Sequence, residues 1–306
     1  MFGKAVAVVM LTGSLGCDKR ASGEPAVVRT SLIGTPTALF LLFGDRDDPR
    51  LLPVAVATRG RIAPISLDSA GWREFDRVYF APAAAFSLYH DGVALKDGAI
   101  RRGMWSQSDP LYKLPGCRSL RPLAAATIGE VPNGGQTLEL LATSRPLVAP
   151  APRAAVTPAD LDSARAFAGR AAQRAGLTRI ARDELELVVY AIQTGATERP
   201  TLVGSYSEKG GGAGPGARHV FAIGDAALEG YAPTYVHSAR DSVPEFRRLI
   251  GHLDLTGDGL DELVLEGWRS GGESFLVIMQ FVGGRWHEVA RGANSWCADA
   301  LPATRG

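Results

Sequence analysis

Short apolar runs separated by glycine-containing dipeptides recur along this chain. Arg59-Gly60, Asp91-Gly92 and Gly283-Gly284 each lie between two such runs. Glycine adopts the positive φ angles that two-residue hairpin turns require, so these dipeptides predict antiparallel hairpins. The 36 Gly and 19 Pro among 306 residues suit a protein of many short strands joined by turns. We therefore predict a mainly β (α+β) fold of antiparallel sheets and hairpins.

One segment has the pattern of a long helix instead. Thr157 is a typical N-cap residue, and Pro158 follows at the first helical position. Small residues recur at helical spacing through the range 158–175, so this helix should lie close against a sheet. Elsewhere, the apolar run Ala38–Phe43 predicts a buried strand. The range Trp72–Ala81 mixes apolar and charged residues, and we predict a strand there as well.

Changes in composition along the chain predict two folded parts. A stretch rich in Pro and Ala, 146–157, has the composition of an extended linker with few contacts. It separates a β-rich N-terminal domain, 31–145, from an α+β C-terminal domain, 158–306, which could be a partial propeller or a sandwich. Before them, residues 1–16 resemble a signal peptide, and 17–30 form a polar tether.

The N-terminus carries the pattern of an export signal. Lys4 precedes the apolar run Ala5–Leu11, which is too short to span a bilayer, and small residues lead to Cys17. This order resembles a bacterial lipoprotein signal. The resemblance implies that Cys17 is lipidated and anchors the protein to a membrane surface in the cell envelope, on the periplasmic or extracellular side. A plain signal peptide, giving a secreted protein, and a buried N-terminal strand are the alternatives.

Two cysteines remain, Cys117 and Cys297. In an oxidising compartment they could form a disulfide that joins the first half of the chain to its C-terminus. The alternative is a pair of unrelated buried thiols.

Oxygen-bearing side chains recur at alternate positions near residue 254. Asp254, Thr256 and Asp258 are spaced by two, Glu262 follows, and two glycines allow a tight turn. Calcium prefers six to eight oxygen ligands in such a flexible loop. An EF-hand would need Glu at the twelfth position, where this chain has Leu265.

An apolar run follows Glu262 directly, so a strand is expected after the loop. Together these residues resemble the calcium loop of FG-GAP/VCBS-type repeats, in a single copy over roughly 247–288. The resemblance implies one Ca²⁺ site in which Asp261 points outward. Its implied ligands are the side chains of Asp254, Thr256, Asp258 and Glu262 and the carbonyl of Leu260. The alternative is a metal-free turn whose Asp side chains bond the backbone.

Charge and motifs exclude several functions. A net charge of +1 gives no electrostatic reason to expect nucleic-acid binding. No nucleophile motif or zinc-binding helix is evident, and the five histidines lack ligand spacing. His252, just before the loop, could flank a cation or be an ordinary strand residue. We predict no catalysis.

The sequence thus favours a non-enzymatic structural or binding module whose partner is another protein or a glycan. The alternative is a secreted hydrolase-like enzyme. Convergent polar groups with displaced pKa values in a pocket would favour the enzyme, whereas a smooth surface would favour the binding module.

Overall fold

The computed structural model describes residues 35–103, 123–129, 137–209, 218–239, 245–269 and 274–293. The predicted signal peptide and tether lie outside these ranges, as do Cys17, Cys117 and Cys297. Within the described ranges, none of the helices has both the length and the apolar character needed to cross a bilayer.

The N-terminal part is a closed β-barrel. Its strands are β1 (Thr37–Asp45), β2 (Arg50–Thr58), β4 (Ala85–His90), β6 (Gly98–Gly103), β7 (Ala124–Thr127) and β8 (Thr137–Thr143). They follow one another in the order β1-β8-β4-β6-β7-β2, and pairing of β1 with β2 closes the ring. Two short strands, β3 (Arg61–Pro64) and β5 (Val93–Ala94), extend β2 and β4 as hairpins. All pairings are antiparallel, as predicted.

The range predicted as a strand at 72–81 is largely helical. Helix α1 spans Ser69–Tyr79, and Asp68 caps it by accepting a hydrogen bond from the N–H of Gly71 at 2.8 Å. Trp72, Phe75 and Tyr79 lie on one helical face and pack into the core of the barrel. Aromatic residues favour strands locally, but this three- and four-residue spacing buries them together only in a helix.

The C-terminal part contains two four-stranded antiparallel sheets. One has the order β12-β11-β10-β9, and the other has the order β13-β14-β15-β16. Their strands are β9 (Glu186–Ile192), β10 (Thr201–Ser207), β11 (His219–Ala227), β12 (Gly230–Ala239), β13 (Glu245–Leu253), β14 (Glu262–Arg269), β15 (Ser274–Val282) and β16 (Arg285–Ala293). A shared apolar core joins the two sheets face to face, so this part is sandwich-like.

The predicted helix near 158–175 is α2 (Pro158–Arg174), followed by the short helix α3 (Arg179–Glu184). Thr157 forms a capping box with Asp160 at its start. The helix lies so close to the sheet that a Cβ atom on Gly204 would come within 2.4 Å of the Ala168 side chain. The expected close packing is therefore confirmed, and it depends on small residues on both surfaces.

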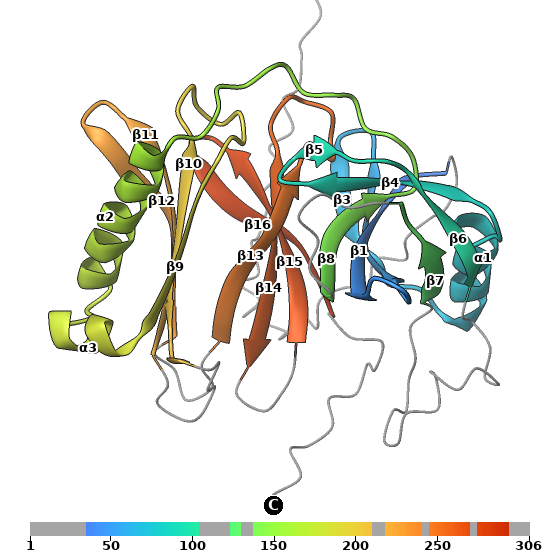
Figure 1. Cartoon of the computed structure of the whole chain (residues 1–306), viewed down its shortest axis with the longest axis horizontal. Helices are drawn as coiled ribbons and strands as arrows, with labels where there is room; N and C mark the ends of the chain where they lie inside the picture. Colours follow the sequence, from blue (N-terminus) through green and yellow to red (C-terminus); the bar gives the residue numbers. More distant parts are fainter. Residues whose placement is uncertain are drawn as a thin grey trace, which may run out of the picture.

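The layers follow one another across the molecule (Figure 1). Helix α2 covers the β9–β12 sheet, the β13–β16 sheet lies in the middle, and the barrel with α1 lies at the opposite end. Strand β1 shows how the barrel contributes to two cores. Its even-numbered residues, such as Phe40, face the barrel interior, and Leu39 and Leu41 pack against the β13–β16 sheet. The middle sheet is therefore covered on both faces.

The Pro/Ala-rich segment 146–157, which we call the strap, runs without regular secondary structure from the barrel to α2 (Figure 1). It does not have the few contacts expected of a linker. The N–H of Leu147 donates to the hydroxyl of Tyr89 at 2.8 Å, and Arg153 bonds to two carbonyl groups of the C-terminal part. Proline keeps the strap extended, while these hydrogen bonds hold it in place.

Candidate functional site

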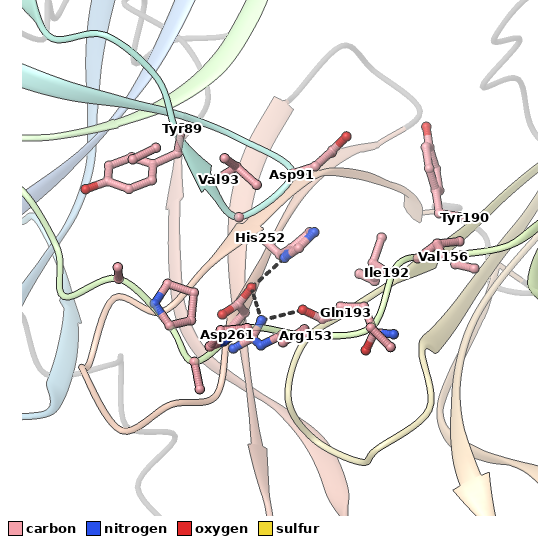
Figure 2. Close-up of a pocket in the computed structure, with 18 of the residues that line it drawn as sticks. Tyr89, Asp91, Val93, Arg153, Val156, Tyr190, Ile192, Gln193, His252 and Asp261 are labelled. Carbon is pink, nitrogen blue, oxygen red and sulfur yellow. Dashed lines mark hydrogen bonds and ion pairs between the residues drawn. The ribbon is translucent and has the colours of Figure 1, made fainter.

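A cavity of about 750 Å³ lies beneath the strap. The β4–β5 hairpin, the strap, β9, the end of β13 and the last residue of the loop before β14 line it, so both parts of the chain contribute (Figure 2). Ligand pockets in proteins typically measure about 300–1,000 Å³ and are lined mainly by apolar side chains. Valine, leucine, isoleucine, alanine and proline side chains make up most of this lining.

The mouth of the pocket exposes apolar side chains. Val148 is 78% exposed, Val93 64%, Val156 39% and Tyr190 38%. In the part of the chain that the structure describes, these are four of nine exposed large apolar side chains. Such clusters commonly mark binding surfaces, because leaving apolar area in water is unfavourable.

Three polar residues meet at the floor of the pocket: Arg153 from the strap, His252 from β13 and Asp261 from the loop before β14 (Figure 2). We call them the floor triad. Asp261 Oδ2 lies 2.8 Å from Arg153 Nη1 and 2.6 Å from His252 Nδ1. Arg153 also donates to the carbonyls of Gln193 and of Gly259, the latter at 2.9 Å.

The triad fixes which nitrogen of His252 carries a proton. A carboxylate paired with a guanidinium is an acceptor only, so His252 Nδ1 must donate to Asp261. In the neutral imidazole, Nε2 then has a free lone pair. Figure 2 shows this second nitrogen directed away from Asp261, toward the space between Asp91 and Tyr190.

Asp261 is buried, whereas the resemblance to calcium loops implied that it points outward. Its side chain is 1% exposed, and its main-chain N–H donates to the carbonyl of Thr194 at 2.8 Å. Asp261 and Glu262 are adjacent where the chain enters β14, so their side chains take opposite sides. Glu262 turns into the loop and Asp261 into the pocket. Among the described residues, Asp261 Oδ1 has no hydrogen-bond partner.

The other side of the loop holds the residues predicted as calcium ligands. We call Asp254, Asp258 and Glu262 the acidic cluster. Asp254 accepts hydrogen bonds from the N–H groups of Gly257 at 2.7 Å, Asp258 at 3.2 Å and Gly259 at 2.9 Å. Asp258 accepts from the N–H of Leu260 at 2.9 Å. These contacts are those of a turn whose carboxylates bond its own backbone.

Glu262 is the most deeply buried member of the acidic cluster. It accepts from the N–H of Leu255 at 2.8 Å and the hydroxyl of Thr256 at 3.1 Å. Burial raises the pKa of Glu262 to about 7; these hydrogen bonds oppose the rise, and the charges of Asp258 and Asp254 add to it. The charges of Asp254 and Asp258 therefore lie close enough to Glu262 to repel its carboxylate.

The donor set suits a hard cation chemically, since it consists of oxygen atoms and excess negative charge. In this conformation, however, the oxygens of Asp254 and Glu262 already accept hydrogen bonds from the loop or from Gln280. Among the described residues, no three His, Cys, Asp or Glu side chains form a group that could hold a metal ion. Calcium binding would require these groups to exchange partners.

Comparisons with known proteins add no family. The chain matches no protein-family model, no curated protein and no solved structure. The likeness to FG-GAP/VCBS loops therefore depends on the residues of the loop itself.

The sequence does not predict the floor triad. It predicts that His252 flanks the loop, that Asp261 points outward, and that Arg153 lies in a linker with few contacts. One signal was available: a single arginine within an otherwise apolar Pro/Ala segment often has a specific partner, because an isolated buried charge is costly.

Proposed function

We propose that this protein is an exported, lipid-anchored binding module that takes up a small, largely apolar molecule in the pocket beneath the strap. The observation that supports this proposal most strongly is the cavity of about 750 Å³, which has exposed apolar side chains at its mouth and polar side chains at its floor. Filling it would remove apolar side chains from water at the mouth, which favours binding by roughly 25 cal/mol per Å² of apolar surface.

The proposed export and anchoring are supported by the N-terminal pattern that ends at Cys17. A lipid at this position would hold the binding module at a membrane surface, where apolar molecules concentrate. Mass spectrometry of the protein from a bacterial membrane fraction tests this step. Acyl groups on an N-terminal Cys17 support it, and a mature protein that begins elsewhere contradicts it.

A neutral apolar dye, N-phenyl-1-naphthylamine, tests the pocket by fluorescence titration of the full chain. We expect saturable binding to the wild type and at least tenfold weaker binding to Val148→Asp, which places a charge at the mouth. Leu228→Asp is the matched control, because Leu228 is 107% exposed in the turn between β11 and β12, outside the pocket lining. Absence of saturable binding by the wild type would overturn the proposal.

A calcium-stabilised loop is part of the same proposal. It is supported by the mutual repulsion within the acidic cluster, which a bound cation would relieve. Millimolar calcium should raise the Tm of the wild type, since a ligand of the folded state stabilises it. Asp258→Ala should abolish the rise. Equal melting curves in calcium and in chelator would remove the metal from the proposal.

A second candidate, a hydrolase, is favoured by one observation. The His252–Asp261 hydrogen bond of 2.6 Å is the arrangement of a general base and the group that orients it. His252 Nε2 would take a proton from water as the water oxygen bonds to an ester carbonyl carbon. The bond from this carbon to the alkoxy oxygen would then break, and the proton would pass from His252 to the leaving alcohol, which leaves a carboxylic acid.

Release of p-nitrophenol from p-nitrophenyl butyrate and decanoate tests the second candidate. Turnover by the wild type that disappears in His252→Phe, while dye binding persists, would favour the hydrolase. Hydrolysis no faster than in buffer would leave the binding module.

A further inference from the structure

We infer that the pocket selects an apolar molecule with a neutral hydrogen-bond donor at its buried end, such as a medium-chain alcohol, over an equally apolar ether or a carboxylate. This inference rests on the proposed binding function. It follows from how the floor triad distributes donors and acceptors.

Arg153 supplies the positive charge of the floor, but its donors are directed at protein groups. Nη1 contacts Asp261 Oδ2 and the carbonyl of Gln193, and Nη2 donates to the carbonyl of Gly259. An anionic head group that bound the same N–H groups would have to displace one of these partners. Because such an exchange leaves a buried acceptor unpaired, the floor should bind a carboxylate poorly.

Within the floor triad, the remaining side-chain atoms are acceptors. Gln193 also lines the pocket and has a side-chain Nε2 with no partner among the described residues, but Figure 2 shows its side chain pointing away from His252. In the neutral imidazole of His252, Nε2 carries a lone pair that can accept a hydrogen bond, because Nδ1 donates to Asp261. Asp261 Oδ1, on the same carboxylate, has no partner among the described residues. A hydroxyl group at the end of an apolar chain would donate to the imidazole nitrogen, whereas an ether oxygen has no proton to give.

Negative charge reinforces the selection. Asp261 lies at the floor, and Asp91 lines the pocket from the hairpin that covers it, with its side chain 69% exposed. A bound carboxylate would face both, and the Arg153 cation at the floor is already paired with Asp261. A neutral donor meets no such repulsion, so the alcohol should be preferred to the acid as well as to the ether.

Gly92 shows how closely the hairpin covers the floor triad. A Cβ atom at this position would lie 2.9 Å from Asp261 Oδ2 and 2.9 Å from His252 Cε1. The hairpin thus limits movement of the imidazole away from Asp261. This restriction keeps the lone pair of Nε2 in one direction, which a selective hydrogen bond needs.

Displacement of N-phenyl-1-naphthylamine from the full chain by three probes tests the inference: 1-octanol, 1-methoxyheptane and octanoate. 1-Octanol and 1-methoxyheptane are isomers, and the main difference between them is that only the alcohol can donate a hydrogen bond. We expect 1-octanol to displace the dye at about tenfold lower concentration than the ether, the size of one hydrogen bond. Octanoate should be the weakest probe.

In His252→Phe, the octanol and ether curves should converge, because the acceptor that distinguishes the two probes is gone. Tyr190→Phe is the control, because its hydroxyl is another polar group near the mouth, and it should keep the preference. Loss of the preference in Tyr190→Phe but not in His252→Phe would overturn the assignment to His252.

The wild-type probe series decides the inference even if His252→Phe fails to fold. Equal displacement by octanol and ether, or tightest binding of octanoate, would overturn it while dye binding still supports the pocket. Failure of the dye to bind at all would instead overturn the proposed function.

Discussion

The two faces of the loop between β13 and β14 bury carboxylates by different means. On one face, Asp254 and Glu262 accept hydrogen bonds from main-chain N–H groups no more than seven residues away, and Gln280 of β15 adds a longer side-chain contact to Glu262. On the other face, Asp261 is held by Arg153 of the strap and His252 of β13. The acidic cluster is therefore largely self-contained, whereas the floor triad joins three separate elements around one carboxylate.

This difference indicates which substitutions should change both the stability of the protein and ligand binding in the pocket. A turn that satisfies its own polar groups keeps them satisfied when its surroundings change. A triad assembled from distant segments exists only while those segments are docked, and it helps to dock them. We therefore expect substitutions in the floor triad to affect unfolding and the pocket together, and substitutions in the acidic cluster to affect mainly the loop.

The largest effect should follow Asp261→Ala. Removal of this carboxylate leaves the half-buried Arg153 guanidinium and the buried His252 N–H without that partner, and breaking a buried charge pair typically costs about 3–5 kcal/mol. Urea unfolding of the two proteins measures the difference. Asp162→Ala is the matched control, because Asp162 pairs with Arg165 on the exposed surface of α2 and should cost less than about 1 kcal/mol. Similar losses in both variants would contradict the comparison.

The next effect concerns the pH dependence of Glu262. Its pKa is about 7 in the folded protein, raised mainly by burial, against an ordinary value of 4.5. Between these values the folded state binds more protons than the unfolded state, so the free energy of unfolding falls as pH rises from 4.5 to 7. The expected loss from this group is about 3 kcal/mol.

Glu262→Gln should remove that part of the pH dependence, because Gln keeps an acceptor for the N–H of Leu255 but does not ionise. Urea unfolding of both proteins in chelator, at steps across this pH range, isolates the contribution. Parallel stability curves for wild type and variant would show that the carboxyl group titrates normally.

The contrast between the two faces also explains what the sequence predicted. Features set by neighbouring residues were found: the hairpins at Arg59-Gly60, Asp91-Gly92 and Gly283-Gly284, and helix α2 with its cap at Thr157. The alternative of a turn that bonds its own backbone also describes the contacts of Asp254.

Features set by distant residues were missed. Arg153 contacts Gly259 across 106 positions of sequence, and no local pattern specifies that contact. The sequence predicts a strand where α1 forms, because the aromatic residues that define its buried face also favour strands. The closure of the barrel by β1 and β2, and the packing of the barrel on the middle sheet, likewise depend on contacts far apart in the chain.

A smaller effect is expected when a Cβ atom is added to the hairpin turns. Comparison of two turns distinguishes the cost of backbone strain from the cost of crowding the floor triad. Gly60 and Gly92 both have φ of 74°, each after a residue with φ of 49°, in equivalent hairpin turns. A Cβ atom on Gly60 would meet nothing within 4 Å, whereas on Gly92 it would press on Asp261 and His252.

Gly60→Ala should therefore cost only the strain, about 1 kcal/mol. Gly92→Ala should cost about 2 kcal/mol more, through crowding. It should also weaken dye binding, which Gly60→Ala should leave unchanged. Thermal unfolding measures the loss of stability, and the dye titration measures the loss of binding. Equal losses of stability in Gly60→Ala and Gly92→Ala would show that the β4–β5 hairpin does not pack against the floor triad.

The smallest effect should come from Asp258→Asn in the presence of chelator. Asn retains an oxygen that accepts the N–H of Leu260, and this contact is exposed, so the free energy of unfolding should change by less than about 0.5 kcal/mol. Loss of the negative charge should lower the pKa of Glu262 toward its ordinary range, since Asp258 contributes to the rise.

Dye affinity of Asp258→Asn should stay at the wild-type value, because the acidic cluster faces away from the pocket. A change in dye affinity as large as that of Gly92→Ala would mean that the two faces of the loop are coupled, and the distinction between a self-contained face and a docking face would fail.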